Sequence, residues 1–157
     1  MKLSDFFVPE AVIPELKATD RNGVIRELTA SLAAAVGMDE AQAAAISKAV
    51  IARENQGSTG FGKGVAVPHV KHPAVKRIMA TLGRSSTGVD FAALDRAPVY
   101  IVVLLLSPPD NPDQHLASME NIFWHLQRDN FRRFLRQAST KEEINENIRE
   151  ADELPGG

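Results

Sequence analysis

The sequence contains no cysteine among its 157 residues. Without thiols it cannot form disulfide bonds, a thiolate nucleophile or a zinc site built on cysteine. These function classes are therefore excluded. The absence of cysteine also fits a reducing compartment.

The sequence also lacks a long apolar run and a strong excess of charge. The longest apolar stretch, Val99–Leu106, is far too short to cross a bilayer, and residues Met1–Asp5 contain no apolar signal-peptide region. We therefore expect a cytoplasmic protein with no membrane insertion and no transporter domain in the same chain. The net charge of −2 is too balanced to suggest nucleic-acid binding.

The length of 157 residues, with 44% hydrophobic residues, is typical of one globular domain with a sizeable core. Internal repeats, low-complexity tracts and linkers are absent from the sequence. We therefore predict one domain over residues 1–157, in which residues 152–157 form a frayed tail.

The segment Pro98–Ser107 is the strongest predicted strand, because its apolar character is continuous. A strand of this kind is buried on both faces, so the sheet that contains it needs helices on both sides. We predict an α/β fold, a three-layer sandwich with a mixed β-sheet and helices on both faces. Further extended segments are expected at residues 11–16, 65–67 and 78–83, with a turn at residues 88–91.

Capping residues and apolar spacing predict the helices. Asp20 or Thr19 is expected to cap a helix that ends at Gly37, and Asp39 a helix over Glu40–Asn55 that Gly57 stops. Ser4, Asn111, Asp129 and Thr140 are the expected caps of a short N-terminal turn and of three later helices. Leu116, Met119, Phe123 and Leu126 form the expected inner stripe of the helix after Asn111, and Phe131, Phe134 and Leu135 that of the next helix.

The segment Arg53–His72 carries the most distinctive chemistry in the chain. Four glycines lie within eight residues of it, at Gly57, Gly60, Gly62 and Gly64. Such a loop allows positive φ angles and can present backbone N–H groups to an anion. His69 follows a short β-branched run and Pro68, where a strand gives way to a loop. A histidine nucleophile, an arginine and a glycine-rich loop together indicate phosphate chemistry.

The residues from Gly57 to His69, GSTGFGKGVAVPH, resemble the active-site signature of the type-2 (fructose/mannitol class) enzyme IIA domains of the bacterial phosphoenolpyruvate-dependent phosphotransferase system. The nitrogen-regulatory subtype is the most similar, and the resemblance covers most of the chain. It departs from the family pattern at Lys63 and Val70. The resemblance implies that a phosphocarrier protein, HPr or its nitrogen-type paralogue, transiently phosphorylates His69 at Nε2, while a backbone carbonyl holds the other ring nitrogen.

The same resemblance implies two partners for His69. Arg53 would neutralise the phosphoryl group through a bidentate guanidinium, although an arginine at a helix C-terminus needs no other role than to favour the dipole. His115 would border His69 from the start of a helix, although it could also be an ordinary first-turn histidine. We interpret both as site residues together with His69.

Several neighbours of the motif leave alternatives open. Ser58, Thr59 and Gly60 are predicted to bind the phosphoryl group, but the two hydroxyls could equally only shape the loop. Phe61 and Val70 would form the apolar centre of a partner-docking patch if they are exposed, and otherwise pack in the core. Glu54 is interpreted as a salt-bridge or capping group.

We expect no metal and no cofactor. His69 and His72 have a spacing that invites a zinc proposal, but two histidines without a nearby carboxylate or thiolate are weak zinc ligands. His72 and His125 are interpreted as non-catalytic.

The sequence thus favours a phosphoryl-relay protein that regulates a target protein of unknown identity. Two alternatives remain open. One is a sugar-transport enzyme IIA that passes phosphate to a separate permease subunit, and the other is a non-phosphorylated module that senses a small anion on the same fold.

Overall fold

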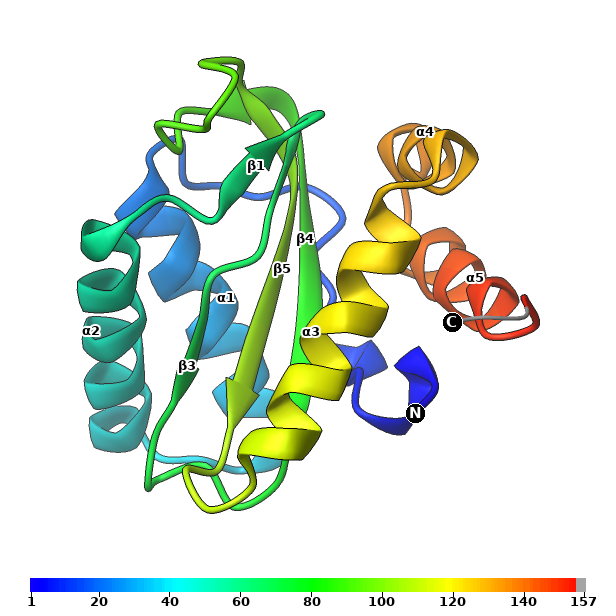
Figure 1. The fold of residues 1–157 in the computed structure, drawn as a ribbon. Helices are drawn as coiled ribbons and strands as arrows, with labels where there is room; N and C mark the ends of the chain where they lie inside the picture. The colour runs from blue at the N-terminus through cyan, green and yellow to red at the C-terminus, as the bar shows by residue number, and fades with distance from the viewer. Residues whose placement is uncertain (155–157) are drawn as a thin grey trace.

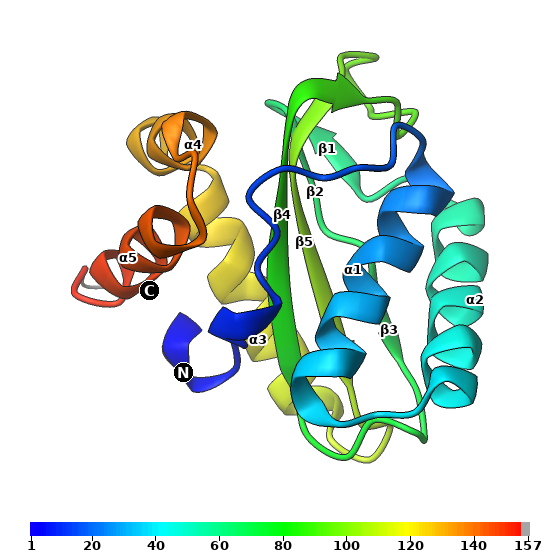
Figure 2. The same ribbon diagram turned by 180° about the vertical axis from the view of Figure 1, so that it is seen from behind.

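The computed structural model describes residues 1–154, and within them a sheet of five strands lies between two helical layers (Figures 1 and 2). Two short 3-10 helices come first, η1 (Leu3–Asp5) and η2 (Pro9–Ala11). The α-helices are α1 (Arg21–Val36), α2 (Glu40–Gln56), α3 (Pro112–Leu126), α4 (Asp129–Gln137) and α5 (Lys141–Ala151). The strands are β1 (Gly60–Gly62), β2 (Val65–Ala66), β3 (His69–Lys71), β4 (Met79–Val89) and β5 (Val99–Ser107).

Strand β5 is the centre of a mixed sheet. It pairs antiparallel with β4 on one side and parallel with both β2 and β3 on the other. The short strand β1 pairs only with β2, so it extends the sheet beside β2 but not beside β3. Among the described residues β5 is the only strand partner of β3, which begins at His69 opposite Leu105. His69 therefore lies on an edge strand.

The alternation of side chains along β5 divides the core into two parts. Ile101, Val103 and Leu105 belong to a cluster that includes apolar residues of α3, α4 and α5. Val102 and Leu104 belong to a second cluster with residues of α1 and α2. Because successive residues of a strand point to opposite faces, a continuous apolar run is what a sheet between two helical layers requires. The predicted three-layer α/β fold is confirmed.

Local capping explains where α1 and α2 begin and end. The Asp20 side chain accepts from the N–H of Gly23, and Gly37 ends α1 in the left-handed region at φ 78°. Asp39 and Gln42 form a reciprocal capping box at the start of α2, which ends before Gly57. These predicted boundaries are confirmed within one residue, and they place the glycine loop directly after α2.

Predictions about two extended segments and about two helix caps need correction. The strand predicted for residues 78–83 continues to Val89, because Arg84 still pairs with Ile101 and Val89 with Val99, so residues 88–89 belong to the strand. Residues 11–16 are not a regular strand. Ala11 is the last residue of η2, and the chain then runs along β4, where Ile13 N–H donates to the Leu82 carbonyl. The early turn and α4 are capped by Lys2 and Arg128, without a side-chain bond, and not by Ser4 and Asp129.

Two inner-stripe predictions are wrong. Leu116 and Phe134 are 58% and 47% exposed, because each lies on the solvent-facing side of its helix. The frayed tail predicted from residue 152 is also wrong at its start. The Asp152 carboxylate accepts from the N–H groups of Leu3 and Ser4, and thus ties the end of α5 to the N-terminus. Residues 155–157 of that predicted tail lie outside the described residues.

None of the helices in the described part of the chain is long and apolar enough to cross a membrane.

Candidate phosphoryl-transfer site

The sequence placed His69 where a strand gives way to a loop, but this is wrong, because parallel pairing with β5 makes His69 the first residue of β3. Pro68 precedes it, and the Pro68 carbonyl accepts from the N–H of Leu105 in the central strand. The imidazole of His69 is half-buried, and Nδ1 lies 2.8 Å from the carbonyl oxygen of Val67. A carbonyl oxygen can only accept, so Nδ1 must carry the proton and Nε2 of the neutral ring keeps its lone pair. The predicted carbonyl partner is confirmed, and the geometry leaves the lone pair of the ring on Nε2.

The surroundings of His69 keep its ring neutral. Burial lowers the pKa of His69, the bond to Val67 opposes this, Arg53 lowers the pKa further and Glu54 raises it again. The net direction is downward from the ordinary value of 6.5. At neutral pH the ring is therefore available as a nucleophile rather than as an imidazolium.

His115 lies beside His69, as expected. It sits in the first turn of α3, and the centroids of the two imidazole rings are 5.6 Å apart. The side chain is buried, and its Nδ1 is 2.6 Å from the hydroxyl oxygen of Ser107. Burial lowers the pKa of His115 to about 4, with further contributions from His69 and Lys71. Both histidines are thus neutral at pH 7, and the Ser107 contact holds the His115 ring in place.

Ser107 is a site residue that sequence reasoning missed. It is the last residue of β5, fully buried, at the point where the apolar run meets Pro108. The sequence does contain a signal for Ser107: a polar residue at the end of a buried strand needs a hydrogen-bond partner for its hydroxyl. Only the packing of α3 against the sheet shows that the partner is His115.

Arg53 lies in the last turn of α2, where its Nη1 donates to the carbonyl of Gly57 at 3.0 Å. It is close enough to His69 to lower the pKa of that ring electrostatically. Arg53 thus contacts the end of its helix and places a positive charge near His69, and a contact to a phosphoryl group stays a prediction.

Glu54 anchors the glycine loop. Its carboxylate is 2% exposed and accepts twice from Thr59, from the backbone N–H at 2.7 Å and from the hydroxyl at 2.8 Å. Neither alternative for Glu54 is therefore correct: within residues 1–154 it forms no salt bridge, and a carboxylate, which only accepts, cannot cap the free carbonyls at the end of a helix. A buried carboxylate that accepts two hydrogen bonds is a strong local constraint, since charged acceptors form the stronger bonds.

The hydroxyls of Ser58 and Thr59 are engaged within the protein. Ser58 donates to the carbonyl of Phe91 at 2.7 Å and accepts from the N–H of Gly60 at 3.0 Å. Gly60 is required for close approach, because a Cβ there would lie 2.9 Å from the Cβ of Ala93. These contacts favour the loop-shaping alternative for both hydroxyls.

Phe61 and Val70 do not lie together. Phe61 is partly buried and packs edge-on against Phe123 of α3, with ring centroids 4.8 Å apart. Val70 is partly buried on the opposite face of the sheet, against the cluster of α1 and α2. The core-packing alternative therefore fits each residue better than a shared docking patch.

The other two histidines have local partners. Nδ1 of His72 accepts from the N–H of Ala74, and Nδ1 of His125 is 3.0 Å from the guanidinium of Arg128. Within residues 1–154, no three or more His, Asp or Glu side chains gather closely enough to hold a metal ion.

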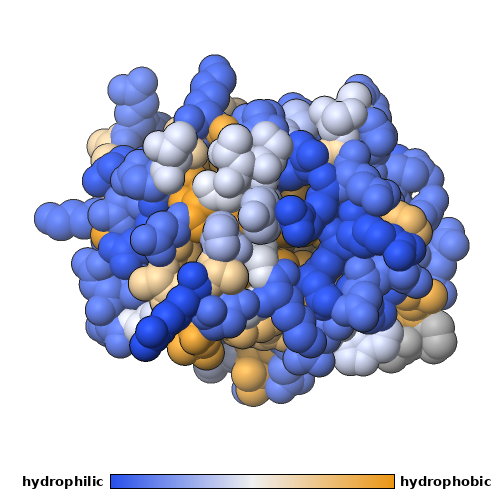
Figure 3. All heavy atoms as spheres, turned by 90° about the horizontal axis from the view of Figure 1, so that it is seen from above, coloured by the Kyte–Doolittle hydropathy of each residue, from blue (hydrophilic) through white to orange (hydrophobic). Residues whose placement is uncertain are grey.

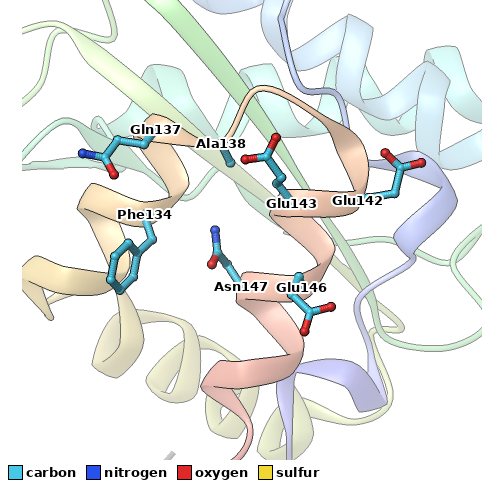
Figure 4. Close-up of a pocket in the computed structure, with 7 residues that line it drawn as sticks. All are labelled: Phe134, Gln137, Ala138, Glu142, Glu143, Glu146 and Asn147. Carbon is cyan, nitrogen blue, oxygen red and sulfur yellow. The ribbon is translucent and has the colours of Figure 1, made fainter.

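A groove of about 430 Å³ between α4 and α5 contains none of the predicted site residues (Figure 4). The exposed ring of Phe134 lies on one side of it, and Glu142, Glu143 and Glu146 come from the other helix (Figure 4). Three carboxylates repel a phosphoryl group, so this groove is not a site for the chemistry that surrounds His69.

Comparison with known proteins identifies the family of the chain. A family model described as "Phosphoenolpyruvate-dependent sugar phosphotransferase system, EIIA 2" matches residues 5–151. The chain is similar to a "Nitrogen regulatory protein" of Bradyrhizobium diazoefficiens, with 34% identity over 78% of each chain. It is also similar to the fructose-specific EIIABC component of Bacillus subtilis, with 28% identity over 97% of this chain but only 24% of that protein.

Among solved structures, the chain is similar to the nitrogen regulatory protein IIA-Ntr of Neisseria meningitidis. The TM-score is 0.82 at 25% identity, and the match covers 92% of this chain and 97% of that one.

Proposed function

Because this chain belongs to the EIIA type-2 family of the phosphoenolpyruvate-dependent sugar phosphotransferase system, we propose that it relays a phosphoryl group through His69. The observation that carries the proposal is the state of that ring. Its Nδ1 is bound to the Val67 carbonyl, which leaves the Nε2 lone pair for attack from the open edge of the sheet.

In the proposed step, the Nε2 lone pair of His69 attacks the phosphorus of a phosphohistidine on the phosphocarrier. The new bond is N–P, and the old N–P bond breaks with its electron pair returning to the donor imidazole. The phosphoryl group moves without a net change of protons or electrons, so the reaction needs positioning and charge stabilisation and little else from the protein.

Arg53 is proposed to stabilise the charge on the moving phosphoryl group. Its guanidinium already lies at the first residue of the glycine loop, on the Gly57 carbonyl. His115 is proposed to position His69 or a phosphoryl oxygen, since it is held by Ser107 and stays neutral at pH 7. Direct contacts from Ser58, Thr59 or Gly60 to the phosphoryl group would require their present hydrogen bonds to rearrange.

We further propose that the relay serves regulation rather than sugar uptake. The chain is 34% and 36% identical to nitrogen regulatory proteins of Bradyrhizobium diazoefficiens and Pseudomonas aeruginosa, compared with 28% for the fructose-specific component. The donor would be HPr or its nitrogen-type paralogue, acting in the cytoplasm, where phosphoenolpyruvate is made. The phosphorylation state would then control binding to a target protein of unknown identity.

The test is incubation with phosphoenolpyruvate, enzyme I and a phosphocarrier, followed by intact mass measurement. We expect one acid-labile phosphoryl group on the wild type and none on His69→Ala, with His72→Ala as the matched control, since His72 lies on the same segment and is also half-buried. Phosphorylation that persists in His69→Ala would refute the assignment. A wild type that binds phosphate but gains no mass would favour the anion-sensing alternative.

A further inference from the structure

A second concentration of positive charge lies away from His69, in a cleft between α4 and the turn that joins β1 to β2. The cleft has a volume of about 480 Å³ and is lined by Lys63, Asp129, Arg132, Arg133, Arg136 and Gln137. Figure 3 looks onto this end of the molecule and shows hydrophilic side chains gathered over α4 beside a hollow. Four cationic side chains face one carboxylate there, a formal excess of three positive charges on a chain whose net charge is −2.

Most of this charge has no counter-ion in the protein. The carboxylate of Asp129 pairs with Arg132. Within residues 1–154, no carboxylate oxygen lies within 4.0 Å of a side-chain nitrogen of Lys63, Arg133 or Arg136. Asp95 lies near the turn, but it accepts from the backbone N–H of Lys63 and from that of Ala97. Like charges held together repel one another, so the cleft is stabilised when an anion enters it.

Each of the three arginines also has a contact within the protein before any ligand arrives. The Arg136 guanidinium stacks over the ring of Tyr100, 3.7 Å from its centroid, and that of Arg133 lies 5.4 Å from the ring of Phe134. Arg132 donates to the carbonyl of Leu126 at 2.8 Å. Guanidinium groups fixed in this way lose little side-chain entropy on binding, and their planar fork matches the oxygens of a phosphate group.

Lys63 completes the cleft from the opposite side. It occupies the tip of the glycine-rich turn with φ 61°, a left-handed conformation that is uncommon for a residue other than glycine. This is one of the two positions where the sequence departs from the family signature. The turn thus places Lys63 on the cleft that the α4 residues also line.

We propose that this cleft binds a small anion that carries two or more linked phosphate groups. The excess of three positive charges matches such a ligand better than a single phosphate. The volume of the cleft falls within the range of small-molecule sites and is far smaller than the surface that a stable protein partner would cover. His69, Arg53 and His115 do not line the cleft, so the proposal does not rest on the relay function.

The experiment is isothermal titration calorimetry with inorganic tripolyphosphate at constant ionic strength. We expect saturable binding at one site of the wild type. Arg133→Gln and Lys63→Gln should each weaken it about tenfold or more, since each removes a charge-assisted contact. Arg26→Gln is the matched control, because it removes the same charge from an exposed residue of α1 on the far side of the sheet.

The outcomes separate the proposal from its rivals. Equal weakening in Arg26→Gln, or the absence of saturable binding, would overturn it as non-specific charge attraction. Sulfate that binds as tightly as tripolyphosphate would overturn the requirement for linked phosphates, and a short oligonucleotide that binds more tightly through the same residues would overturn the small ligand. His69→Ala should bind tripolyphosphate like the wild type, whether or not the relay function is correct.

Discussion

The anchor of the glycine loop gives the sharpest prediction, for the variant Glu54→Gln. The wild-type carboxylate is 2% exposed and both of its oxygens accept from Thr59. Glutamine keeps the shape but offers one acceptor oxygen, and its NH₂ group must face one of the two Thr59 donors. The hydroxyl can rotate to accept, but the backbone N–H cannot.

The expected loss of stability follows from the change in these two hydrogen bonds. Both hydrogen bonds survive, but each changes from a charge-assisted bond to a neutral one, so we expect the free energy of unfolding to fall by about 1.5–3 kcal/mol. For a domain of this size that corresponds to a decrease in Tm of roughly 3–12 °C. Phosphoryl transfer should also slow, because Thr59 helps to shape the loop between Arg53 and His69.

The measurement is urea denaturation, since urea does not screen charge as guanidinium chloride does, together with phosphorylation followed by rapid quench. Glu120→Gln is the matched control, because Glu120 is an exposed residue of α3. If Glu54→Gln unfolds within about 0.5 kcal/mol of the wild type and is phosphorylated at the same rate, the carboxylate does not anchor the loop as we infer.

Three further predictions concern the site and the core. Arg53→Lys should slow transfer by roughly one to two decades despite its retained charge, because lysine lacks the bidentate fork; a wild-type rate in rapid-quench measurements would argue against a contact to the phosphoryl group. His115→Ala should still accept phosphate but pass it on poorly. Wild-type rates of transfer in both directions would contradict a positioning role. Burial, and then the charge of Arg128, lower the pKa of His125 from 6.5 to about 4, so between these values the unfolded state binds a proton that the folded state does not. Stability should therefore fall as the pH drops through this window, by about 3 kcal/mol for this group, and urea titrations at several pH values should show a shallower dependence in His125→Gln.

Much of the fold could be predicted because it depends on local chemistry. Asp20, Asp39 and Gly37 satisfy or release backbone groups at helix ends, and such effects act within a few residues. The continuous apolar run of β5 required two helical layers, because both faces of that strand must be buried. The glycine spacing before His69 likewise predicted a loop that leads into a short strand.

The errors arose where distant segments decide the outcome. The strand was predicted to end at residue 83, but pairing with β5 carries β4 on to Val89. Leu116 and Phe134 have apolar side chains at helical spacing, yet the core does not cover either of them. Hydrophobic spacing identifies a candidate face, whereas packing selects which of its residues the core covers.

The sequence by itself therefore determined the candidate site: a histidine after a glycine-rich loop, with an arginine one helical turn upstream of that loop. The tertiary structure decided which groups surround it. Ser107 meets His115 only because α3 returns across the end of β5, and Ser58 meets Phe91 only because the loop after β4 lies against the glycine loop. A hydrogen bond between distant residues has no local preference to reveal it, because both partners satisfy their bonding with water until the chain folds.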